Sequence, residues 1–269
     1  MAGDHVDMRV RVHSQARLAL LTQGSTKVYK SPSREVCTEQ RLTASVYEGA
    51  ALLLLPDPVQ PFKGSAYQQI QAVYMHPQLS NLLLLDWVSA GRAARGEAWD
   101  FFKWRGRNEV WSLSSSSSSS SSNNNSNSAR ERLLLRDNLV LDDLSPVGAT
   151  STSNYRDAMD DLEVFGTLII RGPVFHKLGR AFMQEFACLP RIRGNPNPKP
   201  NSPHPQSEPS TAAAGSARLT WSAASIRGFV MVKFGAKEVD DAKQWLREML
   251  VRDGTVEQEF GQHCLLCLQ

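Results

Sequence analysis

The feature that most constrains this chain is a series of short apolar segments, separated by turn-forming residues, over more than half of its length. In the first segment Val6, Met8, Val10 and Val12 are apolar, whereas the residues between them are polar or charged. Successive side chains of a strand point to opposite faces, so this period of two predicts a half-buried β-strand.

Further strand candidates follow at short intervals. We expect strands at 18–22, 42–47, 52–55, 70–75, 82–88, 99–105, 133–135 and 139–141. Turn-forming runs separate them, among them Gln23-Gly24-Ser25, Pro56-Asp57-Pro58 and Arg105-Gly106-Arg107-Asn108. Because no strong helical period occurs before about residue 155, the pattern predicts an antiparallel, layered or coiled β architecture.

The final part of the chain mixes strands with helices. We expect strands at 164–170, 219–224 and 229–234, a helix that begins at Pro173, and a second helix over 237–251 that stops at Gly254. A last strand is expected around 263–268. The predicted fold is therefore mainly β, with a few helices in the C-terminal third.

The composition limits the classes of protein to which the chain can belong. It has 269 residues, 41% of them hydrophobic, a formal net charge of +3 and four cysteines. This length suffices for one large β domain or two small ones, and the mild, scattered charge argues against nucleic-acid and membrane partners. No apolar run approaches the roughly 18 residues of a membrane-spanning helix. Because a signal peptide and a disulfide framework are not indicated either, we expect a cytoplasmic protein.

Two low-complexity segments interrupt the pattern. Residues 114–122 are consecutive serines, the Ser/Asn-rich run continues to residue 128, and residues 194–216 are rich in Pro, Asn and Ser. Such segments cannot bury enough apolar surface to offset the entropy of ordering. We predict two disordered inserts, 114–128 and 194–216, within a single domain that spans residues 1–269.

Four stretches occur together in a recognisable order. They are Ala16–Ser31, which contains Thr26-Lys27-Val28-Tyr29; Gly49-Ala50 with Leu55-Pro56-Asp57-Pro58 and Phe62; Gly91-Arg92-Ala93-Ala94-Arg95-Gly96-Glu97 with Trp99 and Phe101; and Leu133-Leu134-Leu135-Arg136-Asp137. In this order and spacing they resemble the UreD (UreH) family of urease accessory proteins, in a fungal-type member. Family members usually carry further strand sequence before the Gly-Asp that is Gly3-Asp4 here, so the resemblance implies a shortened N-terminus.

The resemblance implies a two-layer, β-helix-like scaffold without enzymatic activity. It implies assembly with the accessory proteins UreF and UreG on apo-urease, and delivery of nickel to the urease active site. Nickel would be in transit, with no tightly bound cofactor. The sequence itself contains no GxSxG, P-loop, HExxH or strand-linked GxGxxG motif, which agrees with a protein that is not an enzyme.

A path for a metal ion in transit needs weak ligands that exchange quickly, which oxygen atoms provide better than a tight cage. The acidic residues of the β segment that resembles the family are the candidates for such a nickel path. They are Glu48, Asp57, Asp86, Glu97 and Asp137. For each of them, a solvated surface carboxylate is an equally good interpretation.

A second candidate site lies at the C-terminus, where Cys264 and Cys267 form a CxxC pair beside His263. Two thiolates could bind a metal or act as a redox pair, which would suit a small thiol- or metal-dependent protein. The alternative is a terminal strand that places the two cysteines on opposite faces as small buried side chains.

Three residues are candidates for contacts with partner proteins. Arg92 and Arg95 lie in the Gly-Arg segment, where the alternative is an ion pair within the chain. Trp245 lies beside the apolar face of the last predicted helix and could anchor UreF, or it could simply cover the β layer.

Overall fold

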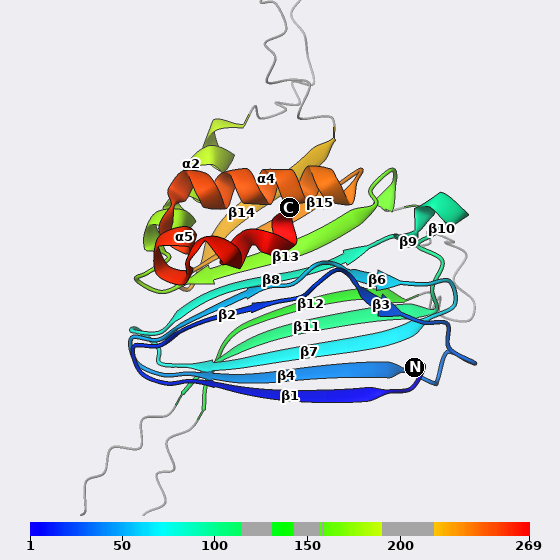
Figure 1. Cartoon of the computed structure of the whole chain (residues 1–269), viewed down its shortest axis with the longest axis horizontal. Helices are drawn as coiled ribbons and strands as arrows, with labels where there is room; N and C mark the ends of the chain where they lie inside the picture. Colours follow the sequence, from blue (N-terminus) through cyan, green and yellow to red (C-terminus); the bar gives the residue numbers. More distant parts are fainter. Residues whose placement is uncertain (114–130, 143–156, 158, 190–217) are drawn as a thin grey trace, which may run out of the picture.

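Figure 1 shows the fold in a computed structural model, which describes residues 1–113, 131–142, 157, 159–189 and 218–269. The two predicted inserts, 114–128 and 194–216, lie outside the described residues. Within the part of the chain that is described, no helix is both long and apolar enough to cross a membrane.

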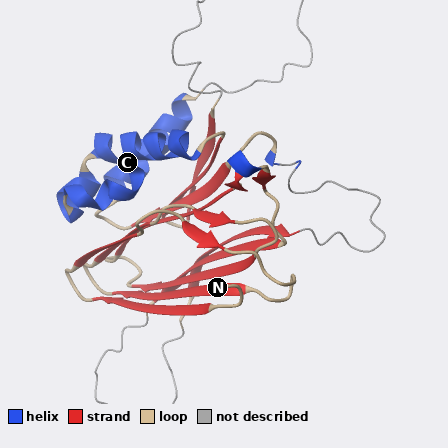
Figure 2. Cartoon of the chain, turned by 45° about the vertical axis from the view of Figure 1, so that its right-hand side comes forward, coloured by secondary structure: helices blue, strands red, loops and turns tan. Residues whose placement is uncertain are grey.

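Two β-sheets face each other and form the body of the molecule (Figure 2). The first sheet has the order β1 (His5–Val12), β4 (Thr38–Val46), β7 (Ala66–Met75), β11 (Lys103–Ser112) and β12 (Leu133–Asp142). The second has the order β14 (Leu219–Ile226), β15 (Phe229–Ala236), β13 (Val164–Arg171), β8 (Asn81–Ser89), β5 (Ala51–Leu55) and β2 (Arg17–Leu21). Short strands β3 (Thr26–Val28) and β6 (Val59–Pro61) extend the second sheet, and β9 (Gly91–Arg92), η1 (Ala93–Arg95) and β10 (Glu97–Ala98) form a small hairpin.

The prediction of a mainly β, two-layer, β-helix-like scaffold is confirmed, but the expected antiparallel pairing is wrong for the first half of the chain. There β1, β4, β7 and β11 are parallel neighbours, as are β2, β5 and β8. The chain passes alternately between the two sheets, so strands that run in the same direction come to lie side by side. Antiparallel pairs begin with β12 and continue through β13, β14 and β15.

The predicted boundaries of two strands in the first sheet, β11 and β12, are wrong. The expected turn at Arg105-Gly106-Arg107-Asn108 lies inside β11, and the strand expected over 99–105 begins only at Lys103. Gly106 is needed for close packing rather than for a turn, because a Cβ atom there would lie 2.4 Å from the Trp104 ring. The two strands expected at 133–135 and 139–141 are one continuous strand, β12.

β1 was predicted to be half-buried along its whole length, but only its C-terminal end is buried. Val12 is buried, whereas the side chains of Val6 and Met8 are 51% and 44% exposed. β1 is an edge strand of the first sheet, and its first residues extend beyond the packed core.

The helices cover the outer face of the second sheet (Figures 1 and 2). They are α2 (His176–Cys188), α4 (Val239–Asp253), α5 (Thr255–Phe260) and the 3-10 helix η2 (Gln262–Leu268). The strand expected around 263–268 is therefore wrong. A short apolar run does not distinguish strand from helix by its period, and here it packs as η2 against β2, β5 and α4.

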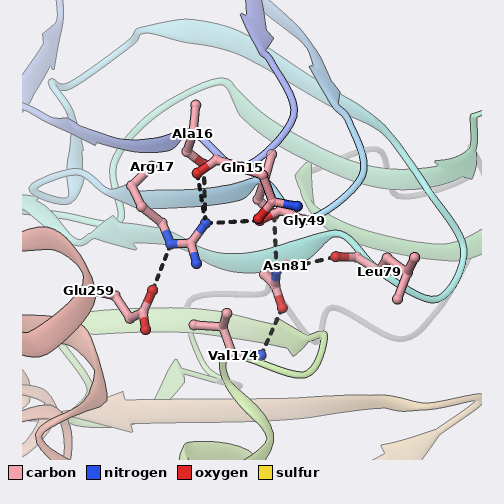
Figure 3. Close-up of polar contacts among 9 residues, drawn as sticks. Gln15, Ala16, Arg17, Gly49, Leu79, Asn81, Val174 and Glu259 are labelled. Carbon is pink, nitrogen blue, oxygen red and sulfur yellow. Dashed lines mark hydrogen bonds and ion pairs between the residues drawn. The ribbon is translucent and has the colours of Figure 1, made fainter.

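A group of hydrogen bonds connects the helical layer to the strands of the second sheet (Figure 3). The Arg17 guanidinium donates to Glu259 of α5 at 2.6 Å and to the Gly49 carbonyl at 2.8 Å. Asn81 donates to the Ala50 carbonyl at 3.0 Å and accepts from the Val174 N–H at 2.8 Å. These bonds join β2 to α5, β8 to the segment that leads into α2, and both strands to the turn before β5.

Candidate functional site: a polar belt between the sheets

A row of polar side chains crosses the space between the two sheets, perpendicular to the strands. In the second sheet Asp86 of β8 pairs with Thr167 of β13, which pairs with Lys233 of β15. In the first sheet Gln71 of β7 pairs with Asn108 of β11, which pairs with Asp137 of β12. Residues directly opposite each other on neighbouring strands share a face of the sheet. Gln69 of β7, which donates to Asp86, and its register partner Gln40 of β4 complete the row. The polar belt comprises Gln40, Gln69, Gln71, Asp86, Asn108, Asp137, Thr167 and Lys233.

The polar belt divides the interior of the sandwich into two apolar clusters. Along β8, Leu84 belongs to one cluster and Val88 to the other, and Asp86 lies between them. The same order of apolar, polar and apolar positions recurs inside the sandwich along β13, where Thr167 lies between Ile169 and Phe165. On β8 and β13, therefore, one polar residue takes an inward-facing position that is apolar at the neighbouring inward positions of the same strand.

Asp86 is the centre of the polar belt and is only 6% exposed. Gln69 donates to its Oδ1 at 2.9 Å, and Asn108 donates to its Oδ2 at 2.7 Å. Gln71 in turn donates to Asn108 Oδ1 at 3.1 Å. The Tyr67 hydroxyl extends the row and lies 3.0 Å from the side-chain oxygen of Gln69.

The other end of the polar belt holds an ion pair. The Lys233 ammonium donates to Asp137 Oδ1 at 2.8 Å and to Thr167 Oγ1 at 3.0 Å, and lies 5.9 Å from the centre of the Phe165 ring. The Asp137 side chain is 10% exposed, whereas that of Lys233 is 38% exposed. Lys233 therefore lies where the polar belt reaches solvent.

The environment of Asp86 changes its acidity. Burial raises the pKa of Asp86 to about 6, and the neighbouring Asp137 charge adds to this effect, against the hydrogen bonds from Asn108 and Gln69 and the Lys233 charge. Burial and the charge of Asp86 also raise the pKa of Tyr67. The carboxylate of Asp86 is thus close to its titration range at neutral pH, which makes it responsive to a cation nearby.

Gly106 leaves room for this carboxylate. A Cβ atom at Gly106 would lie 3.3 Å from Asp86 Oδ2 as well as against the Trp104 ring. Any larger residue would push on both, so the glycine in β11 shapes the polar belt as well as the strand.

The other three predicted nickel-path residues lie elsewhere. Glu48 is exposed in the turn between β4 and β5. Asp57 is buried, and its carboxylate accepts from the Lys243 ammonium of α4 at 2.8 Å and from Thr22 and the Gly24 N–H. Glu97 is paired with Arg92. The structure therefore brings Asp86 and Asp137 into one site and leaves Glu48, Asp57 and Glu97 outside it.

Several residues of the polar belt were not recognised in the sequence. The neutral amides Gln69, Gln71 and Asn108 carry no motif, although two glutamines at strand spacing inside an apolar run are unusual. Lys233 gives the clearest sign, because it is a charged residue in the middle of the apolar segment 229–234.

The predicted partner residues have neighbours within the chain. Arg92 donates twice to Glu97 across the β9–β10 hairpin, at 2.8 and 2.7 Å, and its guanidinium lies 4.1 Å from the centre of the Phe62 ring. Arg95 is exposed in η1. Trp245 is half-buried in an aromatic cluster with Phe182, Trp221 and Phe234, at ring distances of 5.3 to 6.0 Å. This contact pattern agrees with the interpretation that Trp245 covers the β layer.

The C-terminal cysteines are packed into the helical layer. Cys264 and Cys267 lie on η2 and are both buried, whereas His263 is exposed. The expected placement on opposite faces of a strand is wrong, because residues three apart in a 3-10 helix lie on the same side. Burial raises the pKa of both thiols, that of Cys267 to about 11. Among the described residues, no group of three or more His, Cys, Asp or Glu side chains could hold a metal ion.

The chain is similar in sequence to proteins of known family. Residues 1–263 match the family described as UreD urease accessory protein. The chain belongs to this family. It is 30% identical over 278 residues to "Urease accessory protein 4" of Cryptococcus neoformans, an alignment that covers 94% of this chain and 75% of that protein. It is 28% identical over 250 residues to an "Uncharacterized urease accessory protein ureD-like" of Schizosaccharomyces pombe, with 93% and 76% covered.

A bacterial UreD protein is also similar over a shorter region. The "Urease accessory protein UreD" of Sorangium cellulosum is 43% identical over 110 residues, which is 41% of this chain and 34% of that protein. The resemblance to a fungal-type member of the UreD family is thus confirmed. Family membership supports a role for this chain in urease maturation.

Proposed function

We propose that this chain is a non-catalytic scaffold that guides Ni²⁺ toward the active site of apo-urease, in a cytoplasmic complex with UreF and UreG. The observation that carries the proposal is the polar belt, which crosses an otherwise apolar sandwich and contains two carboxylates, Asp86 and Asp137. Such a row is costly to keep in a protein interior unless it serves a purpose, because buried polar groups must all be satisfied.

The chemistry of the polar belt suits an ion that must leave again. Its donor atoms are carboxylate, amide and hydroxyl oxygens, which bind a divalent cation more loosely than a set of thiolates or imidazoles would. Conduction requires sites that attract an ion without holding it. Nickel is in this proposal the cargo, and the chain supplies positions for it rather than a resident metal centre.

The proposed role requires binding and orientation, and no bond is broken or formed on this chain. Asp86 and Asp137 would attract the cation, and the amides of Gln69 and Asn108 would hold the Asp86 carboxylate in place. The thiol alternative has less support, since Cys264 and Cys267 are buried with raised pKa values and are separated from the exposed His263.

The test is complementation of a urease-positive fungal host that lacks its own UreD-family protein. The nickel content of purified urease should rise from background when the chain is expressed, and should fall again with Asp137→Asn. Glu48→Gln is the matched control, because this candidate carboxylate lies on the surface and outside the polar belt. If the chain leaves the nickel content at background, or if Asp137→Asn supports full loading, the proposed route is wrong.

A further inference from the structure

The solvent end of the polar belt has an unusual arrangement. Lys233 lies in the middle of β15, flanked by Val232 and Phe234, and its side chain points into the space between the sheets. Its ammonium is bound by two oxygen atoms that a metal ion could also use, the carboxylate of Asp137 and the hydroxyl of Thr167. The next residue of the same register row, Ser222 of β14, is exposed.

We propose that the Lys233 ammonium is a displaceable plug, which occupies the cation position beside Asp137 and Thr167 until a divalent metal ion replaces it. The inference rests on the proposed function and adds to it the residue that controls entry. A lysine is suited to this role, because its ammonium is a compact charge on a flexible stem. With 38% of the side chain already exposed, the ammonium can return to water without crossing the apolar core.

Such a plug discriminates between cations by charge. A monovalent ion that displaced the ammonium would replace one positive charge by another and would gain little. A divalent ion would bring a second positive charge to the position beside Asp137. The Asp86 carboxylate is near enough to Asp137 for their charges to interact, so it would attract the ion as well. The attraction at such distances is several times stronger in a partly buried site than in bulk water. The polar belt would therefore admit divalent ions in preference to the abundant monovalent ones.

A second lysine that is paired with a buried aspartate shows what a purely structural ion pair looks like. Lys243 Nζ also lies 2.8 Å from a carboxylate, that of Asp57, but its side chain is only 18% exposed. The Asp57 carboxylate also accepts from the Gly24 N–H at 3.0 Å and from Thr22 Oγ1 at 3.2 Å. This pair joins α4 to the loop after β5, which is itself bonded to the turn after β2, and it lies apart from the polar belt. Lys243 therefore provides a matched control.

The experiment is a calorimetric titration of the purified full-length chain with Ni²⁺ alone at neutral pH. Lys233→Met should tighten Ni²⁺ binding by about tenfold, because the removed ammonium competes at short range for the same carboxylate. Lys233→Arg keeps the charge and should bind Ni²⁺ like the wild type, and so should Lys243→Met. Lys233→Gln, which can still donate to Asp137, replaces Lys233→Met if the latter does not fold.

The outcomes separate the inference from the function on which it rests. If Asp86→Asn and Asp137→Asn weaken Ni²⁺ binding while Lys233→Met and Lys233→Gln do not strengthen it, the ion uses the polar belt but Lys233 is no plug. If none of these variants changes Ni²⁺ binding, both the plug and the proposed nickel path are wrong. The inference would also be wrong if Lys243→Met tightened Ni²⁺ binding as much as Lys233→Met does. The loss of any positive charge would then be enough to explain tighter binding.

Discussion

The two interior regions of this protein differ in what they contain. The region between the second sheet and the helices is built from apolar side chains, such as Phe182, Val232 and Leu246. The region between the two sheets is interrupted by the polar belt, with Asp86 at its centre. Apolar burial stabilises a fold, whereas a buried carboxylate destabilises it unless its partners are well placed. We propose that the helical layer mainly provides stability, whereas the polar belt, which lies between two apolar clusters of the sandwich, is retained for the passage of an ion.

The largest expected effect is in the helical layer. Phe182 is fully buried and its ring contacts those of Trp221 and Trp245. Phe182→Ala should lower the free energy of unfolding by about 3–5 kcal/mol, as for other buried aromatic residues. Urea denaturation followed by circular dichroism measures this. A loss below about 1 kcal/mol would mean that this layer is not a stabilising core.

The next largest effect is the pH dependence that arises from Asp86. Its pKa is raised from 3.8 to about 6, so the folded state binds this proton more tightly than the unfolded chain does. The contribution of Asp86 to stability is therefore greatest below about pH 4, decreases as the pH rises to about 6, and stays low above it. The whole change corresponds to about 3 kcal/mol.

Asp86→Asn should remove this dependence. The variant should lose less stability than the wild type between pH 4.5 and pH 7.5 in urea denaturation, by about 2 kcal/mol, because roughly two thirds of the whole change falls in this pH range. Glu48→Gln, at an exposed carboxylate, should keep the wild-type profile. Parallel profiles for Asp86→Asn and the wild type would show that Asp86 is not a strained, buried acid.

Trp245 tests whether the helical layer also serves as a binding surface. Because Trp245 is half-buried in the aromatic cluster, Trp245→Ala should lower the free energy of unfolding by about 2 kcal/mol, somewhat less than a fully buried aromatic residue. The measurement is urea denaturation, followed by co-purification with UreF for the folded fraction. A variant as stable as the wild type that no longer co-purifies would identify Trp245 as a partner anchor instead.

The smallest effect is expected at the surface. Arg95 is exposed in η1, and Arg95→Ala should change the free energy of unfolding by less than about 0.5 kcal/mol. Thermal denaturation measures this, and co-purification with urease would then report on partner binding without interference from misfolding. A large loss of stability would place Arg95 among the residues that hold the β9–β10 hairpin together.

The sequence was sufficient to locate most of the strands, because alternation and short apolar runs between turn residues are local properties. It failed at Gly106, where packing against Trp104 rather than a turn explains the glycine, and at 263–268, where a short apolar run forms a 3-10 helix. Asp86 and Asp137 were among the predicted candidates as charged residues in a β segment. Their neutral partners Gln69 and Asn108 could not be predicted, because they meet Asp86 through sheet register and packing between distant segments.

If the polar belt serves nickel delivery, as we propose, replacing its two carboxylates should stop nickel loading and leave the fold intact. The most direct test is reconstitution of apo-urease with UreF, UreG, Ni²⁺ and this chain carrying both Asp86→Asn and Asp137→Asn, followed by measurement of nickel per urease active site. We predict a variant that is folded, that co-purifies with its partners, and that leaves the nickel content of urease near background. Full nickel loading by this double variant would show that nickel does not use the carboxylates of the polar belt.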